Sequence, residues 1–336
     1  MPQHIDIGSP TLYIFFSIAV AIMICIDMLA LKKTGNHQVS LKEAGIWSAI
    51  WVSVALTFNL WLWWHLKNTS IEGVSAELQN TFANKVALDF LTGYLIEKAL
   101  SVDNIFVFLM IFSYFKVPAK YQRRVLVYGI VSAIILRIIM ILIGSALISR
   151  FDWVLYIFGA LLIYTGITMV KKSEEDEDLE NSFILKSLRR ILPVTPNYHE
   201  ERFFVPRESM KGEKFKLIAT PLFLVLMMIN ITDVVFAVDS VPAIFAITTD
   251  PFVVMTSNVF AILGLRAMYF LLADMADRFH LLNYGLAVIL MFIGTKMLII
   301  KWMHIPTFIS LGFVLVVLVC SIVLSLYVKK KEKTVH

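Results

Sequence analysis

The sequence predicts an all-α protein that crosses a membrane several times. Of its 336 residues, 59% are hydrophobic and only 16% are charged, whereas a soluble domain carries about 25% charged residues. The apolar residues are gathered in runs of about 20 or more, and a helix of that length crosses the ~30 Å hydrocarbon core of a bilayer. These observations exclude a water-soluble enzyme and predict a polytopic helical membrane protein.

Nine apolar stretches are long enough to be membrane spans. The first follows a segment without Lys or Arg and is itself followed by Lys32 and Lys33, so we expect it to be a retained span and not a cleaved signal peptide. Cys25 and Cys320 both lie inside apolar stretches, so no disulfide framework is expected. The stretches cover approximately residues 11–30, 44–66, 86–114, 125–148, 152–170, 217–249, 252–272, 281–300 and 307–328.

The distribution of basic residues predicts the orientation. The connection after the first span, every second connection after it and the C-terminal tail together hold 22 of the 30 Lys and Arg residues. The opposite side holds four, and four lie within spans. Because basic loops stay in the cytoplasm, we expect the N-terminus outside and the C-terminus inside. This bias also explains the net charge of +5 without a nucleic-acid partner.

The two halves of the chain resemble each other. The segment EKALSVDNIFVF (97–108) aligns with DVVFAVDSVPAIF (233–245), and matched residues continue through the next two spans of each half. Each copy holds three spans, and because three is odd the second copy enters the membrane from the opposite side, which gives an inverted-topology repeat. The matched pairs include Glu97 with Asp233, Asp103 with Asp239, Asn104 with Ser240, Arg137 with Arg266, and Gly166 with Gly294.

The repeat divides the chain into five regions. We expect two N-terminal helices (1–85), a first three-helix repeat (86–170), a charged cytoplasmic linker (171–216), a second repeat (217–300), and a last helix with a basic tail (301–336). The linker opens with six acidic residues between 174 and 180. We interpret it as a solvated connection between the halves, with a cation-gathering or cation-sensing segment as the alternative.

Ionisable residues within the predicted spans mark the candidate site. A charged side chain near the bilayer centre costs at least ~2.5–3.5 kcal/mol, so such residues are usually functional. Six acidic and four basic residues leave two negative charges, which one divalent cation would neutralise, although a carboxylic acid can also stay protonated. These residues are Asp27, Asp89, Glu97, Asp103, Asp233, Asp239, Lys98, Arg137, Arg266 and Lys296.

The chemistry of these side chains favours a hard cation. No histidine lies in the middle of a span, and oxygen ligands suit Mn²⁺, Mg²⁺ or Ca²⁺ better than Zn²⁺ or Cu⁺. The predicted metal ligands are Glu97, Asp103, Asn104, Asp233, Asp239 and Ser240, with Asn230, Asn59 and Asn258 as further oxygen donors. The alternative is that the acids form structural ion pairs, in particular Glu97 with Lys98. Lys98, Arg137 and Arg266 are expected to balance charge or gate the site when the ion leaves. Lys296 matches Thr168 in the first repeat, and the sequence assigns no function to this difference.

The spans that lead the two repeats are longer than a straight crossing needs. We expect the second, 217–249, to be broken close to its acids because Pro242 follows Asp239 by three residues. In an ideal helix Glu97 and Asp103 point about 120° apart. A local unwinding is therefore the route by which we expect both acids to reach one cavity.

The motifs around the acids resemble those of the TerC family of integral membrane proteins, and within it the Alx branch. The similarity rests on FLTGYLIEKALSVDNIFVFLMIFSYF (90–115), TDVVFAVDSVPAIFAITTDPF (232–252) and SNVFAILGLRAMYFLL (257–272), and covers nearly the whole chain. It implies a multi-pass protein of the bacterial inner membrane, linked to manganese efflux and, for the wider family, to tellurium resistance. It also implies membership of the LysE-type transporter superfamily. The same resemblance makes the six predicted ligands the expected ion-path residues.

Two functional hypotheses follow. The first is a secondary transporter that exports Mn²⁺ in exchange for protons, needs no cofactor, and works on hard divalent cations within the lipid bilayer. The second is a membrane scaffold associated with tellurium resistance or with metal delivery to exported proteins. The sequence has no Walker A loop, HExxH motif or GxSxG elbow, so we expect neither nucleotide hydrolysis nor another enzyme activity.

Overall fold

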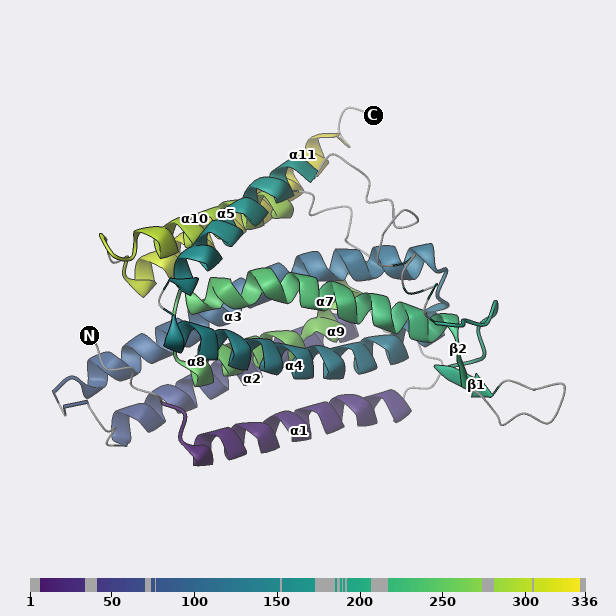
Figure 1. The fold of residues 1–336 in the computed structure, drawn as a ribbon, viewed down its shortest axis with the longest axis horizontal. Coiled ribbons are helices and arrows are strands. Elements are labelled where there is room, and N and C mark those ends of the chain that lie inside the picture. The colour runs from purple at the N-terminus through teal and green to yellow at the C-terminus, as the bar shows by residue number, and fades with distance from the viewer. Residues whose placement is uncertain are drawn as a thin grey trace.

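The protein is a bundle of long helices with one short hairpin at an end (Figure 1). The computed structural model describes residues 7–33, 41–69, 74–75, 77–151, 153–172, 185, 188, 190, 192–206, 217–273, 281–303 and 305–332. The acidic run between 174 and 180 lies outside these residues. The elements are α1 (Pro10–Lys33), α2 (Leu41–Asn68), α3 (Gln79–Tyr114), α4 (Ala119–Arg150), α5 (Val154–Lys172), β1 (Phe204–Pro206), β2 (Leu217–Ala219), α7 (Pro221–Phe245), α8 (Pro251–Leu263), α9 (Leu265–Ala273), α10 (Leu282–Ile299) and α11 (Thr307–Glu332).

Several of these helices could cross a membrane. Among the described residues, four are long and apolar enough by themselves: Lys42–Asn68, Ala119–Arg150, Pro221–Phe245 and Thr307–Ser325. The pair α8 and α9 would add a fifth span that is bent by 41°. Three more apolar helices are shorter: Pro10–Ile26, Val154–Val170 and Tyr284–Ile299. The prediction of an all-α membrane protein with several apolar helices is therefore confirmed.

Helix α8 lies at the centre of the bundle. Every residue from Phe252 to Ala267 is buried, as expected of a helix that is apolar on all sides. Its start is fixed locally, because Asp250 accepts a hydrogen bond from the Val253 amide at 3.0 Å and Pro251 occupies the first turn, where its missing N–H has no helical partner to lose. Helices α3, α4, α2 and α1 pack around it.

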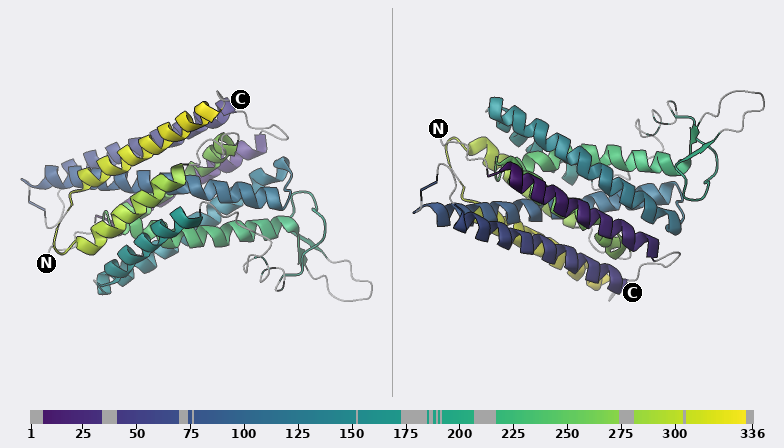
Figure 2. Two further views of the ribbon diagram at one scale, coloured as in Figure 1. Left: turned by 90° about the horizontal axis from the view of Figure 1, so that it is seen from above. Right: turned by 90° about the horizontal axis from the view of Figure 1, so that it is seen from below.

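The two three-helix segments pack on each other reciprocally, because the first helix of each packs on the second helix of the other. Helix α3 packs on α8, and α7 packs on α4. The third helices, α5 and α10, lie side by side along most of their length (Figures 1 and 2). Helix α11 contacts α10 and α3 on the outside of this pair.

The sequence predicts that the first span of the second repeat is broken close to its acids, and the structure shows no break there. Helix α7 is continuous through Asp233 and Asp239 and ends at Phe245, one turn beyond Pro242. Because only the last turn follows the proline, its missing amide leaves the body of the helix intact. The interruption lies instead at Gly264, between α8 and α9. Helix α3 is also continuous over 36 residues, so the acids are not brought together by unwinding.

The last part of the linker is tied to one end of the bundle. Strands β1 and β2 pair in antiparallel fashion, and Thr220, which follows β2, donates from its hydroxyl to the Arg202 carbonyl at 2.7 Å. Tyr198 donates to the Phe115 carbonyl at 2.7 Å, and burial raises the pKa of its phenol to about 12. This part of the linker therefore packs against the end of α3.

Candidate ion site

A buried arginine on α4 forms the centre of the candidate site. The guanidinium of Arg137, which is 1% exposed, donates hydrogen bonds to the carboxylate of Glu97 on α3 and to Asp233 Oδ1 on α7 at 3.2 Å. It also donates to Ser240 Oγ and to Asn258 Oδ1, both at 3.0 Å. One cationic group is thus surrounded by four residues from three other helices, each of which accepts a hydrogen bond through an oxygen atom.

Helical spacing explains which of the repeated residues reach this centre. Asp233 and Ser240 are seven residues apart and share a face of α7, as Glu97 and Asn104 do on α3. All four are at most 2% exposed. Because α3 packs on α7, and α4 packs on α7 and α8, the two acids meet Arg137 between continuous helices. The matched acids Glu97 and Asp233 are therefore brought together by helix packing.

The hydrogen bonds of this cluster are incomplete. Glu97 Oε2 and Asp233 Oδ2 are buried and have no hydrogen-bond partner among the described residues, and the same holds for Arg137 Nε. Leaving a buried polar atom without a partner costs about 1–3 kcal/mol, and more for a charged group. The two free carboxylate oxygens have the chemistry needed to bind a further cation or proton.

Of the second pair of repeated acids, Asp239 lies apart from this centre. Asp239 is half-buried and accepts a hydrogen bond from Thr165 Oγ1 of α5 at 2.8 Å. It is six residues from Asp233, so it points from a different face of α7. Asp103 lies in α3, but its side chain falls outside the described structure. Glu97, Asp233 and Ser240 thus lie together around Arg137, and Asp239 lies apart from them.

The three basic residues expected to balance charge lie on different helices. Lys98 donates to the carbonyl oxygen of Ala261 on α8 at 3.2 Å, while the ion-pair partner of its neighbour Glu97 is Arg137. Arg266 is buried at the start of α9. Arg137 is bound to one carboxylate from each repeat.

Two hydroxyl groups were not among the sequence-based candidates. Thr165 bonds Asp239 as described above, and Ser132 of α4 donates to Asn230 Oδ1 of α7 at 2.5 Å. Both are polar residues inside apolar spans, so the same sequence pattern could have identified them as candidates. Of the extra amide candidates, Asn258 joins the centre, Asn230 bonds Ser132, and Asn59 is buried on α2 with Oδ1 unpartnered among the described residues.

A second polar cluster lies between α3, α10 and α11. Asp89, which is 2% exposed, accepts from Thr307 Oγ1 at 2.8 Å and lies 3.6 Å from Lys85 Nζ. Lys296 donates to Ser310 Oγ at 3.0 Å and is close enough to interact electrostatically with Asp89. These contacts tie α11 to the bundle and account for two of the charges that lie within spans.

The described side chains do not form a metal centre of the usual kind. Among them, no three His, Cys, Asp or Glu residues lie close enough together to hold an ion. The central cluster offers two carboxylates, with neutral oxygens from Ser240 and Asn258. Any ion bound there would compete with Arg137 for the same oxygens.

Comparison with known proteins gives a consistent picture. Residues 82–333 match the model of a family described as the integral membrane protein TerC family. The chain is 52% identical over 326 residues to proteins of Shigella flexneri and Escherichia coli K12 that bear the name Alx, given to a proposed membrane-bound redox modulator. These alignments cover 97% of this chain and 97–98% of the relatives. A protein of the same name from Photorhabdus laumondii is 49% identical over 98% of both chains. No solved structure matches the chain.

Proposed function

The chain belongs to the integral membrane protein TerC family, and from this premise we propose that it is a secondary transporter that exports Mn²⁺ from the cytoplasm in exchange for protons. We infer that it works in the inner membrane of a bacterium. The candidate spans among the described residues are α-helices, and the Alx relatives come from Gram-negative bacteria. Mn²⁺ is the transported substrate and not a resident cofactor.

The observation that carries this proposal is the environment of Arg137. Its guanidinium is a tethered cation held by oxygens that come from both repeats, Glu97 from the first and Asp233 from the second. A site that holds one cation in this way has the charge and the donors to hold another when the arginine moves. We infer that Mn²⁺ and Arg137 alternate between the two carboxylates.

The donor set supports a hard cation. Carboxylate, amide and hydroxyl oxygens surround Arg137, and Mn²⁺ favours such oxygen ligands. Two carboxylates match the charge of one divalent ion if Arg137 withdraws. If Arg137 stays, two carboxylates and one guanidinium leave a single negative charge, which one proton neutralises. The same cluster can therefore exchange a metal ion for protons.

The packing of α5 and α10 supports an inverted repeat. A Cβ on Gly159 would lie 2.9 Å from the Gly294 carbonyl oxygen, and one on Gly166 would lie 2.8 Å from the Ala287 carbonyl oxygen. The partner residue falls by seven as the first rises by seven, so the helices run antiparallel. The repeat matches Gly166 with Gly294 and, at the same offset, Gly159 with Ala287, so exchanging the two copies turns one contact into the other. This is the relation expected from a twofold axis in the membrane plane.

The arrangement of the ends supports the predicted orientation, with the N-terminus out, the C-terminus in, and nine spans. Helix α1 begins at the end of the bundle opposite the β1–β2 hairpin, and α11 runs toward the hairpin end (Figure 1). Strand β1 of the hairpin belongs to the linker between residues 171 and 216, which holds ten of the basic residues, and β2 follows it directly. The linker and the basic tail thus share the end that the positive-inside rule assigns to the cytoplasm.

The test is transport by the purified protein alone. We expect inside-out vesicles with an acidic lumen to take up Mn²⁺, and to take up far less Zn²⁺ or Cu⁺. Asp103→Asn and Asp239→Asn should abolish uptake without loss of the folded protein, because each removes a negative charge from the ion path. Glu201→Gln, at an exposed linker residue, is the control and should transport like the wild type.

The outcome also decides between the two hypotheses. A scaffold that only delivers metal to other proteins would leave these vesicles without uptake, and its cellular effect would disappear when its partner is deleted. Equal uptake of zinc and manganese would contradict the assignment of a hard-oxygen site. Wild-type transport by both aspartate variants would place the ion path elsewhere.

A further inference from the structure

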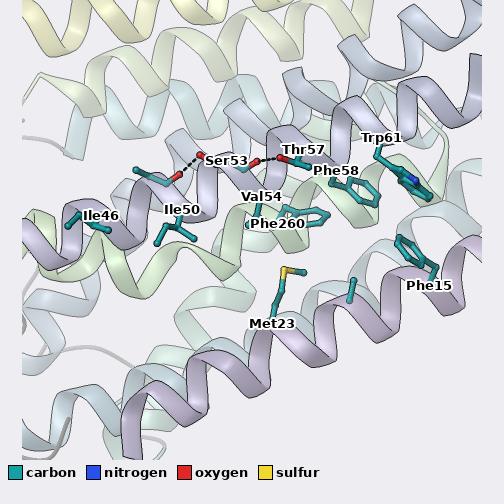
Figure 3. A pocket seen from close by; sticks show the side chains of 12 residues that line it. Phe15, Met23, Ile46, Ile50, Ser53, Val54, Thr57, Phe58, Trp61 and Phe260 are labelled. Carbon is teal, nitrogen blue, oxygen red and sulfur yellow. Dashed lines mark hydrogen bonds between the residues drawn. The ribbon is translucent and has the colours of Figure 1, made fainter. Parts of the chain in front are cut away.

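A long apolar groove separates α1 from α2 (Figure 3). Its volume is about 690 Å³, within the range of roughly 300–1,000 Å³ found for pockets that bind small molecules. Phe15 and Met23 of α1 line one side, Ile46, Val54 and Trp61 line the other, and Phe260 of α8 lies at the back. Arg137 is not among its lining residues, eleven of which lie on α1 and α2 and one on α8.

Small side chains contribute to both walls of the groove. Ala19 of α1 and Ala49 of α2 both line it, and α1 packs on α8 and α4. Its lining residues on α2 recur at intervals of three and four from Ile46 to Trp61. Those 15 steps span roughly 22 Å at 1.5 Å per residue, so the groove is long and narrow and suits an extended chain.

The polar groups in the wall exclude a ligand that needs hydrogen bonds. The two hydroxyls of the lining bind carbonyls of their own helix, Ser53 to Ala49 and Thr57 to Ser53, each at 2.8 Å (Figure 3). Their protons are thus used within the helix, and the remaining lining residues are apolar except for the indole N–H of Trp61. A hydrocarbon chain satisfies this wall, whereas a ring with carbonyl groups or a peptide would lose hydrogen bonds on entering.

The two ends of the groove differ in chemistry. At one end Phe15 and Trp61 pack ring against ring, with centroids 4.8 Å apart. The other end reaches Ile46, one turn from the exposed Lys42 near the start of α2. Lys32 and Lys33 stand at the last positions of α1, at the same end, and Glu43 follows Lys42 in α2. The charge at this end is therefore complementary to an anionic headgroup, and basic residues between membrane helices bind such lipids.

We propose that the groove binds an acyl chain of an anionic phospholipid from the cytoplasmic leaflet, with its headgroup beside Lys42. The acyl chain fills the space between α1 and α2 beyond the Phe15–Trp61 contact and lies against Phe260 of α8. The proposal depends on the placement of the protein in a membrane and not on manganese transport, so the vesicle experiment above does not decide it.

The test is the lipid that remains with the protein after purification in a mild detergent, measured by native mass spectrometry and by extraction. Ala49→Trp fills the groove from α2 and Ala19→Phe fills it from α1, and we expect both to lose the bound phospholipid. Ala146→Trp, at an exposed position of α4, makes a matched change outside the groove and should keep it. Lys42→Gln should retain lipid but lose the preference for phosphatidylglycerol and cardiolipin over phosphatidylethanolamine.

Several results would overturn the proposal. Equal lipid retention by wild type and both filled variants would show that the groove holds no acyl chain. Recovery of a quinone, or of a lipid-free dimer that the filled variants abolish, would assign the groove to another occupant. An unchanged lipid preference in Lys42→Gln would contradict the headgroup position. Thermal unfolding of each variant in detergent shows that the comparison is between folded proteins.

Discussion

At the scale of single residues, the central fact is that one arginine binds two acids from different parts of the chain. Arg137 is the sole cation in the cluster with Glu97, Asp233, Ser240 and Asn258 within the described structure. Burying charges is costly, and the cluster is stable only while its members remain paired. The residue therefore serves the stability of the fold, and in the proposed transport cycle it would compete with the metal ion for the same oxygens.

Replacing Arg137 should change both properties. We expect Arg137→Gln to lower the free energy of unfolding by about 3–5 kcal/mol, because two buried carboxylates lose their partner. Added Mn²⁺ should restore more stability to this variant than to the wild type, and bound Mn²⁺ should be released more slowly. Thermal unfolding in detergent with and without Mn²⁺ measures the first effect, and metal release from the loaded protein measures the second.

The control is a second ion pair that involves an arginine. Arg124 bonds Glu201 at 3.0 Å, and both side chains are substantially exposed, so Arg124→Gln should cost about 0–1 kcal/mol. The double variant Arg137→Gln with Glu97→Gln should regain part of the lost stability, since one of the unpaired charges is removed. If Arg137→Gln behaves like Arg124→Gln, the central cluster does not hold the charges as described.

At the scale of helices, close backbone contact decides how the two repeats join. Gly159 and Gly294 let α5 and α10 approach until each backbone touches the other, a packing that membrane helices use because small residues allow it. The sequence gives no direct sign of this partner, because the two glycines lie in different repeats. The repeat does show that Gly294 has an equivalent in Gly166, and that glycine also faces the opposite helix.

Enlarging one of these glycines should separate the helices. A Cβ on Gly294 would lie 2.6 Å from the Gly159 carbonyl oxygen, and overpacking of this kind costs about 1–3 kcal/mol or more. We therefore expect Gly294→Val to lower the unfolding temperature in detergent. Gly312→Val on α11, where nothing lies within 4 Å of the added carbon, is the matched control and should unfold like the wild type. The same loss in both variants would contradict the close contact.

At the scale of the whole molecule, the charges within the spans connect the fold to the proposed exchange. The sequence places more acids than bases within the predicted spans, and a low-dielectric interior disfavours leaving that difference uncompensated. Protons can balance it when the metal ion is absent, and Mn²⁺ must displace them because only deprotonated oxygens bind a hard cation well. Alternating occupation of one central site between two inverted repeats is the general design of many secondary transporters.

This coupling predicts a dependence of metal binding on pH. The apparent affinity of the purified protein for Mn²⁺ should rise with pH until the participating carboxylates are fully ionised, because protons compete with the metal for the same oxygens. Binding should release protons into a weakly buffered solution. Calorimetry across a pH series in two buffers of different ionisation enthalpy measures both quantities. Affinity that does not change with pH, without proton release, would rule out the exchange and leave a proton-independent carrier.

The sequence by itself determined the class of protein and the chemistry of its site. Apolar runs predict the helices because a bilayer leaves no other partner for the backbone polar groups, and the ends of the helices agree with the runs to within a few residues for most spans. The acids at 97 and 233, the arginine at 137 and the asparagine at 258 were all recognisable as polar groups in apolar spans. The basic residues also suffice to predict an orientation.

Only the tertiary structure decided which of these groups meet. A separation of six positions places Asp233 and Asp239 on different faces of a continuous helix, so Asp233 reaches Arg137 while Asp239 reaches Thr165. The partner of Glu97 is an arginine 40 residues away and not the adjacent Lys98. Such choices depend on the packing of α3, α4, α7 and α8 against one another, which a local pattern cannot specify because every contact joins residues that are distant in the chain.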